Sequence, residues 1–493
     1  MIRKIRWWLM ALVLCGVLFT SVSLNWQPAA NGTPTQAQIL HALNRLSFGP
    51  TVGDVQQVQK MGLEAYIQGQ LNPETLSDPP KLTQTLAKLP TLKLTANQLF
   101  KQYNLPKQKD GRKPSDEELK KLRQRSNQPL QQAIQARLLR SVTSSRQLQE
   151  VMVDFWFNHF NVYARKAHNR FWTGSYEIEA IRPHALGKFR DLLEATARHP
   201  AMLVYLDNWQ NSAPGSPGAR GRFKGLNENY ARELMELHTL GVNGGYTQTD
   251  VITLAKILTG WGIVRPDKPK GGEFYFDEKR HDFSDKVLLG QAIPGQGVPE
   301  VEQALDILAS HPSTARHVSY KLAQYFVSDN PPAALVDRMA EQFLASEGDI
   351  SAVLETLFQS DEFWDPQYYG QKFKTPYQYI VSLLRATGTT DIPTKQVAGW
   401  LRQMGMPPYE CITPDGYKNT EEAWLSPDAV QRRISLALSI SRGHFKRKQP
   451  VDVNQLSQTL KGLLSPQTLE VINNNPKNLK VGLMLGSPEM MQR

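Results

Sequence analysis

Apolar residues recur at helical spacing along most of the chain. Residues 346–360 show the pattern, with an N-cap at Asp349 and apolar side chains at i, i+3, i+4, i+7 and i+8: Ile350, Val353, Leu354, Leu357 and Phe358. Residues 313–326 repeat it through Ala315, Val318, Leu322, Tyr325 and Phe326. Because alternating runs are few, the pattern predicts a mainly α fold, a large multi-helix domain.

Three stretches interrupt this pattern. Within residues 272–290, the aromatic side chains of Phe274 and Phe276 are spaced two residues apart, and a turn-rich stretch follows. This pattern predicts a small β-hairpin insertion. Residues 101–127 are rich in Lys and Arg and poor in apolar side chains, which predicts a charged, solvated insertion. Residues 211–225 are rich in Gly, Pro and Ser and predict a flexible loop. An N-terminal helical segment at 36–100 and a main helical body at 128–493 remain.

The N-terminus has the order of a secretory signal. Arg3, Lys4 and Arg6 precede an apolar run that ends near Val22, and small residues follow up to Ser23. The pattern predicts a signal peptide over residues 1–23, with cleavage there or as late as residue 30, and a periplasmic or extracellular protein. The alternative is an uncleaved N-terminal anchor, although the run is shorter than the ~20 residues that span a bilayer.

Composition and charge narrow the class of protein. The chain has 493 residues, 40% of them hydrophobic and 21% charged, which is a globular balance with enough length for more than one core. Cys15 and Cys411 are its two cysteines, so the count excludes a structural zinc site made of Cys ligands. The net charge is +11, and basic residues cluster at 442–448. In an exported protein, this charge favours an anionic envelope polymer over nucleic acid as the partner.

Residues 227–251 contain several closely spaced polar side chains that could form a site. On a helix, Glu228, Arg232 and Glu236 share one side at i,i+4 spacing, which is typical of an exposed salt-bridge ladder. Glu233 lies at the boundary between this charged side and the apolar side of the helix, and His238 lies at the edge of the apolar side. The same residues are candidates for a reactive site at a helix end, and this alternative stays open. An EF-hand is excluded because the following loop lacks the required carboxylates.

A second polar stripe runs through the aromatic stretch 148–172. If this stretch is one helix, Glu150, Asp154, Asn158 and Asn161 share a narrow face, which must meet water or be hydrogen-bonded inside the protein. The aromatic neighbours favour burial or the wall of a cleft. His159 points away from the stripe and is either a core residue or a site residue.

A third candidate is the pair His281–Asp282 near Lys286. It could form an acid–base pair or simply the polar edge of the hairpin. No His-Glu-x-x-His, Gly-x-Ser-x-Gly or Walker motif occurs in the chain, so the sequence specifies neither a metal nor a cofactor.

Taken together, these stretches resemble the bacterial exported family known as domain of unknown function 1800. The matching runs are HALNRLSFGPTVGDV from His41, MVDFWFNHFNVY from Met152, NENYARELMELHTLGVNGGYTQTDV from Asn227, LTGW from Leu258, HPSTARHVSYKLAQYFVSDNPP from His311, KFKTPYQYIVSLLRATG from Lys372 and LGSPEMMQR from Leu485. Residues 404–424 match less closely. The resemblance implies an exported, largely helical protein and supplies no activity. It also implies a partner from a second exported family that resembles phosphatases and sulfatases.

Two classes of function remain open. The chain is expected to be a binding or assembly protein of the cell envelope, whose polar stripes are buried hydrogen-bond networks. The alternative is an extracytoplasmic, hydrolase-like enzyme that acts on a polysaccharide or its anionic substituents, with carboxylates converging beneath residues 211–225. The binding interpretation is favoured because the motifs do not assemble a complete catalytic constellation.

Overall fold

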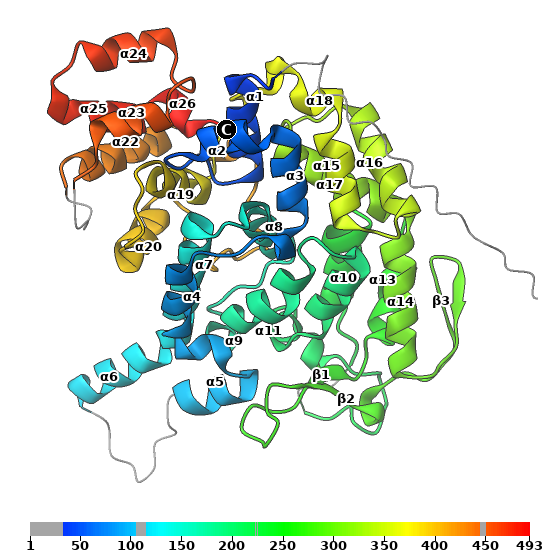
Figure 1. Ribbon diagram of the computed structural model, residues 1–493. Helices are drawn as coiled ribbons and strands as arrows, with labels where there is room; N and C mark the ends of the chain where they lie inside the picture. Colours follow the sequence, from blue (N-terminus) through cyan, green and yellow to red (C-terminus); the bar gives the residue numbers. More distant parts are fainter. Residues whose placement is uncertain (1–32, 105–114, 222, 224, 444–449) are drawn as a thin grey trace, which may run out of the picture. The chain divides into compact units, whose positions relative to one another are not determined.

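The computed structural model describes residues 33–104, 115–221, 223, 225–443 and 450–493. The predicted signal peptide lies outside the described residues, as do the middle of the predicted charged insertion and most of the basic cluster at 442–448. Residues Pro34–Arg493 form one compact unit. Within it helices dominate, which confirms the predicted mainly α fold (Figure 1).

Three helices of the N-terminal third, the first, fifth and sixth, begin with capping boxes. Thr35 and Gln38 form a capping box at the start of the first helix, as Thr95 and Gln98 do for the fifth. The helices are α1 (Gln36–Leu46), α2 (Asp54–Met61), α3 (Leu63–Leu71), α4 (Pro80–Ala87), α5 (Ala96–Tyr103), α6 (Asp116–Ser126) and α7 (Gln128–Thr143). α6 lies in the predicted insertion 101–127. It is a mostly exposed helix, capped by Ser115 and Glu118, so this part of the insertion is solvated but regular.

The central part of the chain contains many of the buried core residues. Its helices are α8 (Gln147–His159), α9 (Asn169–Tyr176), α10 (Phe189–Arg198), α11 (Pro200–Tyr205), α12 (Asn229–Glu233), α13 (Gln248–Ile257), α14 (Val298–Ser310), α15 (Pro312–Phe326), α16 (Ala333–Ala345), α17 (Ile350–Phe358) and α18 (Asp361–Trp364). Two π-helical turns, η3 (Glu177–Ile181) and η6 (Leu234–Thr239), continue α9 and α12. The predicted helices at 313–326 and 346–360 are confirmed as α15 and α17.

The aromatic stretch 148–172 is two helices and not the single helix that its spacing suggested. α8 ends at His159, and Phe160 leaves helical geometry with φ −103° and ψ 51°. Beyond it the Ala164 N–H donates to the carbonyl of Tyr409 at 2.9 Å, and Ala167 takes a left-handed φ of 48°. A segment distant in sequence thus supplies the hydrogen bonds that a continuing helix would have made itself.

The β structure consists of two short antiparallel pairs. β1 (Trp261–Ile263) pairs with β2 (Phe274–Phe276), and β3 (Lys286–Leu288) pairs with β4 (Gln291–Ile293). The predicted strand at Phe274–Phe276 exists, but its partner precedes it, so the hairpin at 272–290 is wrong in its pairing. Phe274 packs against the buried Trp261 ring at 4.7 Å, which fixes that choice. Leu289 and Gly290 both have positive φ and form the tight turn between β3 and β4.

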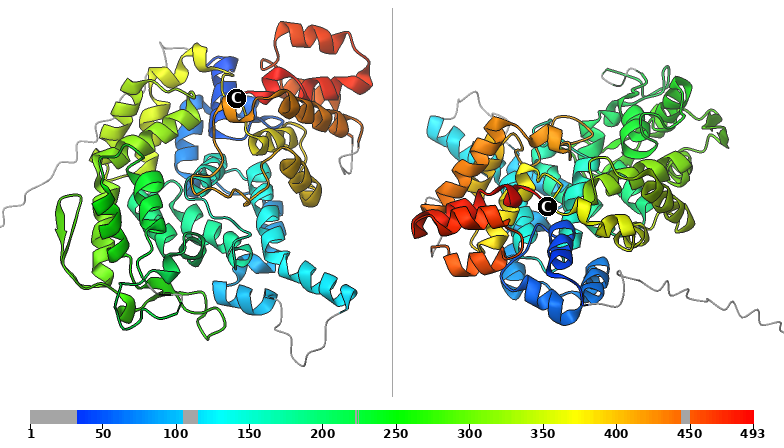
Figure 2. Two further views of the ribbon diagram at one scale, coloured as in Figure 1. Left: turned by 180° about the vertical axis from the view of Figure 1, so that it is seen from behind. Right: turned by 90° about the horizontal axis from the view of Figure 1, so that it is seen from above.

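The C-terminal part contains a wholly buried helix. Every residue of α19 (Pro376–Ala386) is buried. The remaining helices are α20 (Thr394–Gln403), α21 (Glu421–Trp424), α22 (Pro427–Ser441), α23 (Val453–Thr459), α24 (Pro466–Asn473), α25 (Lys477–Leu485) and α26 (Pro488–Met491). α22 and α25 pack side by side, drawn in orange and red in Figure 1. Between α20 and α21, residues 404–420 run without regular structure, as the views of Figure 2 show; they are called the 404–420 segment below.

Candidate functional site

The stretch 227–240 forms a helix whose second half is π-helical. In η6 the Leu240 N–H donates to the Met235 carbonyl at 2.8 Å, a separation of five residues. A π turn displaces later side chains from α-helical spacing. Arg232, which precedes the π turn, pairs with Glu228 at 3.2 Å, whereas Glu236, which lies within it, accepts a hydrogen bond from the Tyr246 hydroxyl at 3.1 Å. Only the first step of the predicted salt-bridge ladder forms.

Two histidine side chains contact backbone carbonyl groups at the C-terminal end of η6. Nε2 of His159, the last residue of α8, lies 3.0 Å from the His238 carbonyl, and Nε2 of His317 in α15 lies 3.3 Å from the Leu237 carbonyl. The last carbonyls of a helix lack partners within it, and a carbonyl can only accept. Each Nε2 therefore carries the hydrogen and each Nδ1 is a bare acceptor. Burial lowers the pKa of both rings, to about 4 for His317, so both are neutral at pH 7.

His238 itself is a core imidazole. It is 1% exposed, and its ring centroid lies 5.0 Å from that of Phe160 and 6.1 Å from that of His159. Neither ring nitrogen makes a hydrogen bond of normal geometry. Burial lowers its pKa to about 3, against an opposing effect of the nearby Pro414 backbone. Its packing makes it a support for His159 and not a group that reaches solvent.

His159 and His317 line a pocket of about 400 Å³, called the histidine pocket below. Its polar lining comes from α8, α15, α19 and the 404–420 segment: Asp154, Asn158, His159, His317, Tyr320, Lys321, Gln324, Tyr325, Thr375, Gln378, Asp415, Tyr417, Lys418, Asn419 and Thr420. A cavity of this size accommodates a small ligand. Of the predicted site residues, the structure brings Asp154 and His159 together here.

The 404–420 segment forms one wall of the histidine pocket. Nδ2 of Asn158 donates to the Tyr417 carbonyl at 2.6 Å, and its Oδ1 accepts from the Tyr417 N–H at 2.7 Å. Nδ2 of Asn161 donates to the carbonyls of Cys411 and Thr413 at 3.0 and 2.8 Å. Two members of the predicted polar stripe thus hold the segment by its backbone, as expected for interior hydrogen bonding.

The two carboxylates of the stripe belong to a buried chain of alternating charges. Asp154 accepts from Arg137 at 2.5 Å, Arg137 lies 3.3 Å from Glu177, Glu177 lies 3.3 Å from Arg182, and Arg182 pairs with Glu150 at 2.6 Å. Burial raises the pKa of Asp154, while the Arg137 guanidinium acts in the opposite direction. Asp154 is therefore engaged by Arg137 and anchors α8 to α7.

Glu233 and Glu236 lie beside the histidine pocket and do not line it. Burial raises the pKa of Glu233, and the neighbouring carboxylates of Glu236 and Asp415 raise it further. These two candidates therefore form a half-buried acidic edge outside the pocket.

His281 and Asp282 belong to a separate, structural cluster. Nε2 of the buried His281 donates to Glu300 in α14 at 2.9 Å, and Lys286 donates to the other oxygen of Glu300 at 2.7 Å. The predicted pairing of His281 with Asp282 is replaced by this one, and Asp282 instead accepts from the Ser284 hydroxyl at 2.6 Å. Burial acts to raise the pKa of Glu300, yet the bonds from His281 and Lys286 hold it below its usual value. The cluster ties β3 to α14.

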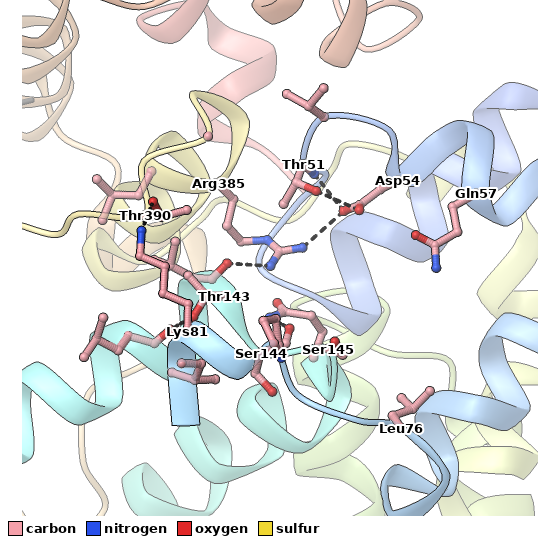
Figure 3. A pocket seen from close by; sticks show the side chains of 18 of the residues that line it. Thr51, Asp54, Gln57, Leu76, Lys81, Thr143, Ser144, Ser145, Arg385 and Thr390 are labelled. Atoms are coloured by element: carbon pink, nitrogen blue, oxygen red, sulfur yellow. Dashed lines mark hydrogen bonds and ion pairs between the residues drawn. The ribbon is translucent and has the colours of Figure 1, made fainter. Parts of the chain in front are cut away.

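A larger cavity lies between the N-terminal helices and α7 and α19, and sequence reasoning did not find it. Its volume is about 560 Å³, and it is called the Asp54 cavity below (Figure 3). Hydroxyl and amide side chains line it: Thr51, Gln57, Gln70, Thr85, Gln135, Thr143, Ser144, Ser145, Gln147, Thr389 and Thr390. Its aliphatic lining includes Leu43, Val58, Leu76, Leu82, Leu139, Val142, Leu384 and Ile392.

One ion pair crosses the wall of the Asp54 cavity. Arg385 donates through Nε to the Gly49 carbonyl at 2.7 Å, through one terminal nitrogen to the Val142 carbonyl at 3.0 Å, and through the other to Asp54 at 3.3 Å. Asp54 also accepts from the backbone and hydroxyl of Thr51 at 2.8 and 2.7 Å (Figure 3). One feature of the sequence could have indicated these two residues. Asp54 and Arg385 each lie in a run that carried the family resemblance.

The described part of the chain lacks two features. No group of three or more His, Cys, Asp or Glu side chains there could hold a metal ion. No helix among the same residues has the length and apolar character needed to cross a membrane.

Comparison with known proteins shows the family. The model of the family described as "Protein of unknown function (DUF1800)" matches residues 41–492, and the chain belongs to this family. No curated protein and no solved structure matches the chain.

Proposed function

We propose that this DUF1800 family member is an exported binding protein of the bacterial cell envelope that holds a segment of a neutral polysaccharide in the Asp54 cavity. The observation that carries the proposal is a cavity of ligand size whose partly buried ion pair, Asp54–Arg385, is already satisfied within the protein. Export rests on the basic head and apolar run at the N-terminus.

The lining supports a neutral ligand with many hydroxyl groups. Arg385 uses Nε and both terminal nitrogens on protein acceptors, so its charge is not presented to a ligand. Lys81, at the edge, donates to the Thr390 hydroxyl at 3.1 Å. Apart from Asp391 and Tyr66, the rest of the lining consists mainly of hydroxyl, amide and aliphatic groups, the mixture that recognises a polar but uncharged molecule.

The same lining supports binding over catalysis in this cavity. No histidine or cysteine is among its lining residues, and its best-placed carboxylate, Asp54, already accepts from Thr51 and Arg385. A general base must be able to reach the proton that it removes. The lining therefore favours recognition over catalysis, because the carboxylate in contact with the Thr51 hydroxyl is also held by Arg385.

A blocked cavity tests the proposal. Ser145 is exposed and lines the cavity with a side chain that nothing else requires, so Ser145→Trp should fill the entrance and leave the fold intact. We expect calorimetric binding of short neutral oligosaccharides to the wild type, and a loss of at least about tenfold in the variant. Ser310→Trp, at the exposed end of α14, is the matched control and should bind normally. Equal binding by all three proteins, or none by the wild type, would overturn the proposal.

The histidine pocket supports a second candidate, an extracytoplasmic hydrolase acting on a polysaccharide or its anionic substituents. The specific observation is the hydrogen bond from His159 Nε2 to the His238 carbonyl, which leaves Nδ1 as a bare acceptor in a neutral ring. A neutral imidazole lining a pocket beside Lys321 is the kind of group that serves as a general base. Binding stays first because Asp154, the nearby carboxylate, is engaged by Arg137.

A further inference from the structure

We propose that the histidine pocket binds an oxyanion, the carboxylate, sulfate or phosphate group of a small ligand, with Lys321 as its charge partner. The pocket is separate from the Asp54 cavity, so the inference does not depend on neutral-polysaccharide binding there. It names a ligand class for the pocket of the second candidate function and stands on its own observations.

Lys321 is the first of these observations. It lies on α15 next to the pocket wall and is only partly exposed. Burial lowers the pKa of its ammonium, the neighbouring Lys418 lowers it further, and Asp415 opposes both. No carboxylate of the described residues lies within ion-pair distance of Lys321. An ammonium held partly out of water without a partner is unfavourable, and a bound anion would relieve this cost.

The carboxylates of the pocket are committed elsewhere. Asp154 is paired with Arg137 at 2.5 Å, and Asp415 is paired with Lys418, also at 2.5 Å. Each of these two carboxylates is thus in contact with a cation. Lys321 is the lining cation for which the described residues show no such contact, and its charge favours an anionic ligand.

The side-chain amide of Asn419 adds a neutral hydrogen-bond donor to the proposed anion site. Asn419 lines the pocket, and both polar atoms of its side chain are buried without a hydrogen-bond partner. Buried amides normally have partners, so this group points to something that the pocket holds. The Asn419 amide nitrogen and the Lys321 ammonium are both donors, and an oxyanion accepts from each.

The size of the pocket indicates what carries the anion. A volume of about 400 Å³ is far larger than a bare sulfate or phosphate ion needs, since a water molecule occupies only about 30 Å³. Tyr320 and Tyr417 lie in the same lining and add aromatic side chains to it. A sugar ring bearing one acidic group would use both the charge and the space.

Binding of simple probes tests this inference. Sodium sulfate, inorganic phosphate and glucuronate would be titrated into the full-length protein at constant ionic strength, with heat as the readout. We expect at least one probe to bind the wild type, and Lys321→Met to weaken it about tenfold or more. Lys321→Arg should retain binding, because the guanidinium also pairs with oxyanions. Lys395→Met, on the exposed face of α20, removes the same charge away from the pocket and should leave binding unchanged.

The relative affinities of the probes identify the source of the anion, and the variants test the inference itself. Tighter binding of glucuronate than of the inorganic ions assigns the site to an acidic sugar, and the reverse order assigns it to a free ion. Lys321→Met should keep or raise the melting temperature, which shows that it folds. Unchanged binding in Lys321→Met, or no binding of any probe to the wild type, would overturn the inference. Neutral-oligosaccharide binding in the Asp54 cavity should not respond to Lys321→Met, so the two proposals fail independently.

Discussion

Asp154 and Glu236 are both acidic residues of the family runs, yet their surroundings differ. Asp154 is 8% exposed and bonded to Arg137, so Asp154→Asn leaves a buried guanidinium short of its partner. Breaking such a pair costs about 3–5 kcal/mol. Glu236 bonds to the Tyr246 hydroxyl at a partly exposed position, and a glutamine oxygen can still accept that bond. Glu236→Gln should therefore lower the free energy of unfolding by less than about 1 kcal/mol.

Urea unfolding of the two variants measures this difference. Glu228→Gln, which breaks a partly exposed i,i+4 pair, is the control and should cost only about 0.2–0.5 kcal/mol. If Glu236→Gln is as destabilising as Asp154→Asn, then Glu236 belongs to a buried network and the assignment made from its hydrogen bond is wrong.

At the same scale, the sequence predicts which residues share a face and not which residues they meet. Helical spacing correctly grouped Glu150, Asp154 and Asn158 on one polar stripe, and the expectation of interior hydrogen bonds is confirmed. The partners could not be read from spacing, because Tyr417 follows Asn158 by 259 residues. For the same reason His281 was assigned to the adjacent Asp282, whereas its partner is Glu300, 19 residues on.

At the scale of elements, periodicity predicts helices well where the chain makes its own hydrogen bonds. It fails beyond the end of α8, where another segment supplies a partner, and within η6, where the hydrogen bonds of the helix span five residues. The Tyr409 carbonyl accepts from the N–H of Ala164, and His159 and His317 donate to the last carbonyls of η6. The strand at Phe274–Phe276 was likewise predicted, but the packing of Phe274 on Trp261 decides its pairing.

The contact between α8 and the 404–420 segment depends on one glycine. Gly416 has φ +67°, and a methyl carbon added there would collide with the Asn158 carbonyl oxygen and Oδ1. Gly416→Ala should therefore loosen the wall of the histidine pocket. We expect a loss in the free energy of unfolding well above the roughly 1–2 kcal/mol that left-handed geometry alone costs a side chain.

Gly370→Ala separates the two contributions. Gly370 has φ +65°, nearly the same geometry, and nothing lies within 4 Å of the added carbon. Chemical denaturation of both variants should show the larger loss for Gly416→Ala, and hydrogen exchange should increase in residues 404–420 of that variant only. Equal losses would mean that the segment adjusts to the side chain and does not depend on this close contact.

At the scale of the whole molecule, cavities depend on segments that meet only after folding. The Asp54 cavity is built from residues 43–85, 135–147 and 384–392, and Asp54 and Arg385 are 331 positions apart. The sequence predicted the helices that form these walls, and the family match covers all of them. It could not predict the space between the helices, because that space follows from their packing and not from periodicity.

Buried neutral histidines make the stability of the whole molecule depend on pH. Burial lowers the pKa of His199 and His238 to about 3 and that of His317 to about 4, and it also lowers the pKa of His41 and His159. In the unfolded chain these rings take up protons below about pH 6.5. The unfolded state then binds more protons than the folded state, so the free energy of unfolding falls as the pH drops from about 6.5 towards 4.

Urea unfolding at pH 7, 6 and 5 should show this loss, with each such ring contributing up to about 1.4 kcal/mol per pH unit below its unfolded pKa. His317→Gln removes one ring, while its amide can still donate to the Leu237 carbonyl. This variant should be less stable at neutral pH, where the ring packs well, and should lose stability less steeply between pH 6 and 5. A free energy of unfolding that stays constant from pH 7 to 5 in the wild type would contradict the assignment, because it would mean that the rings are protonated to the same extent in both states.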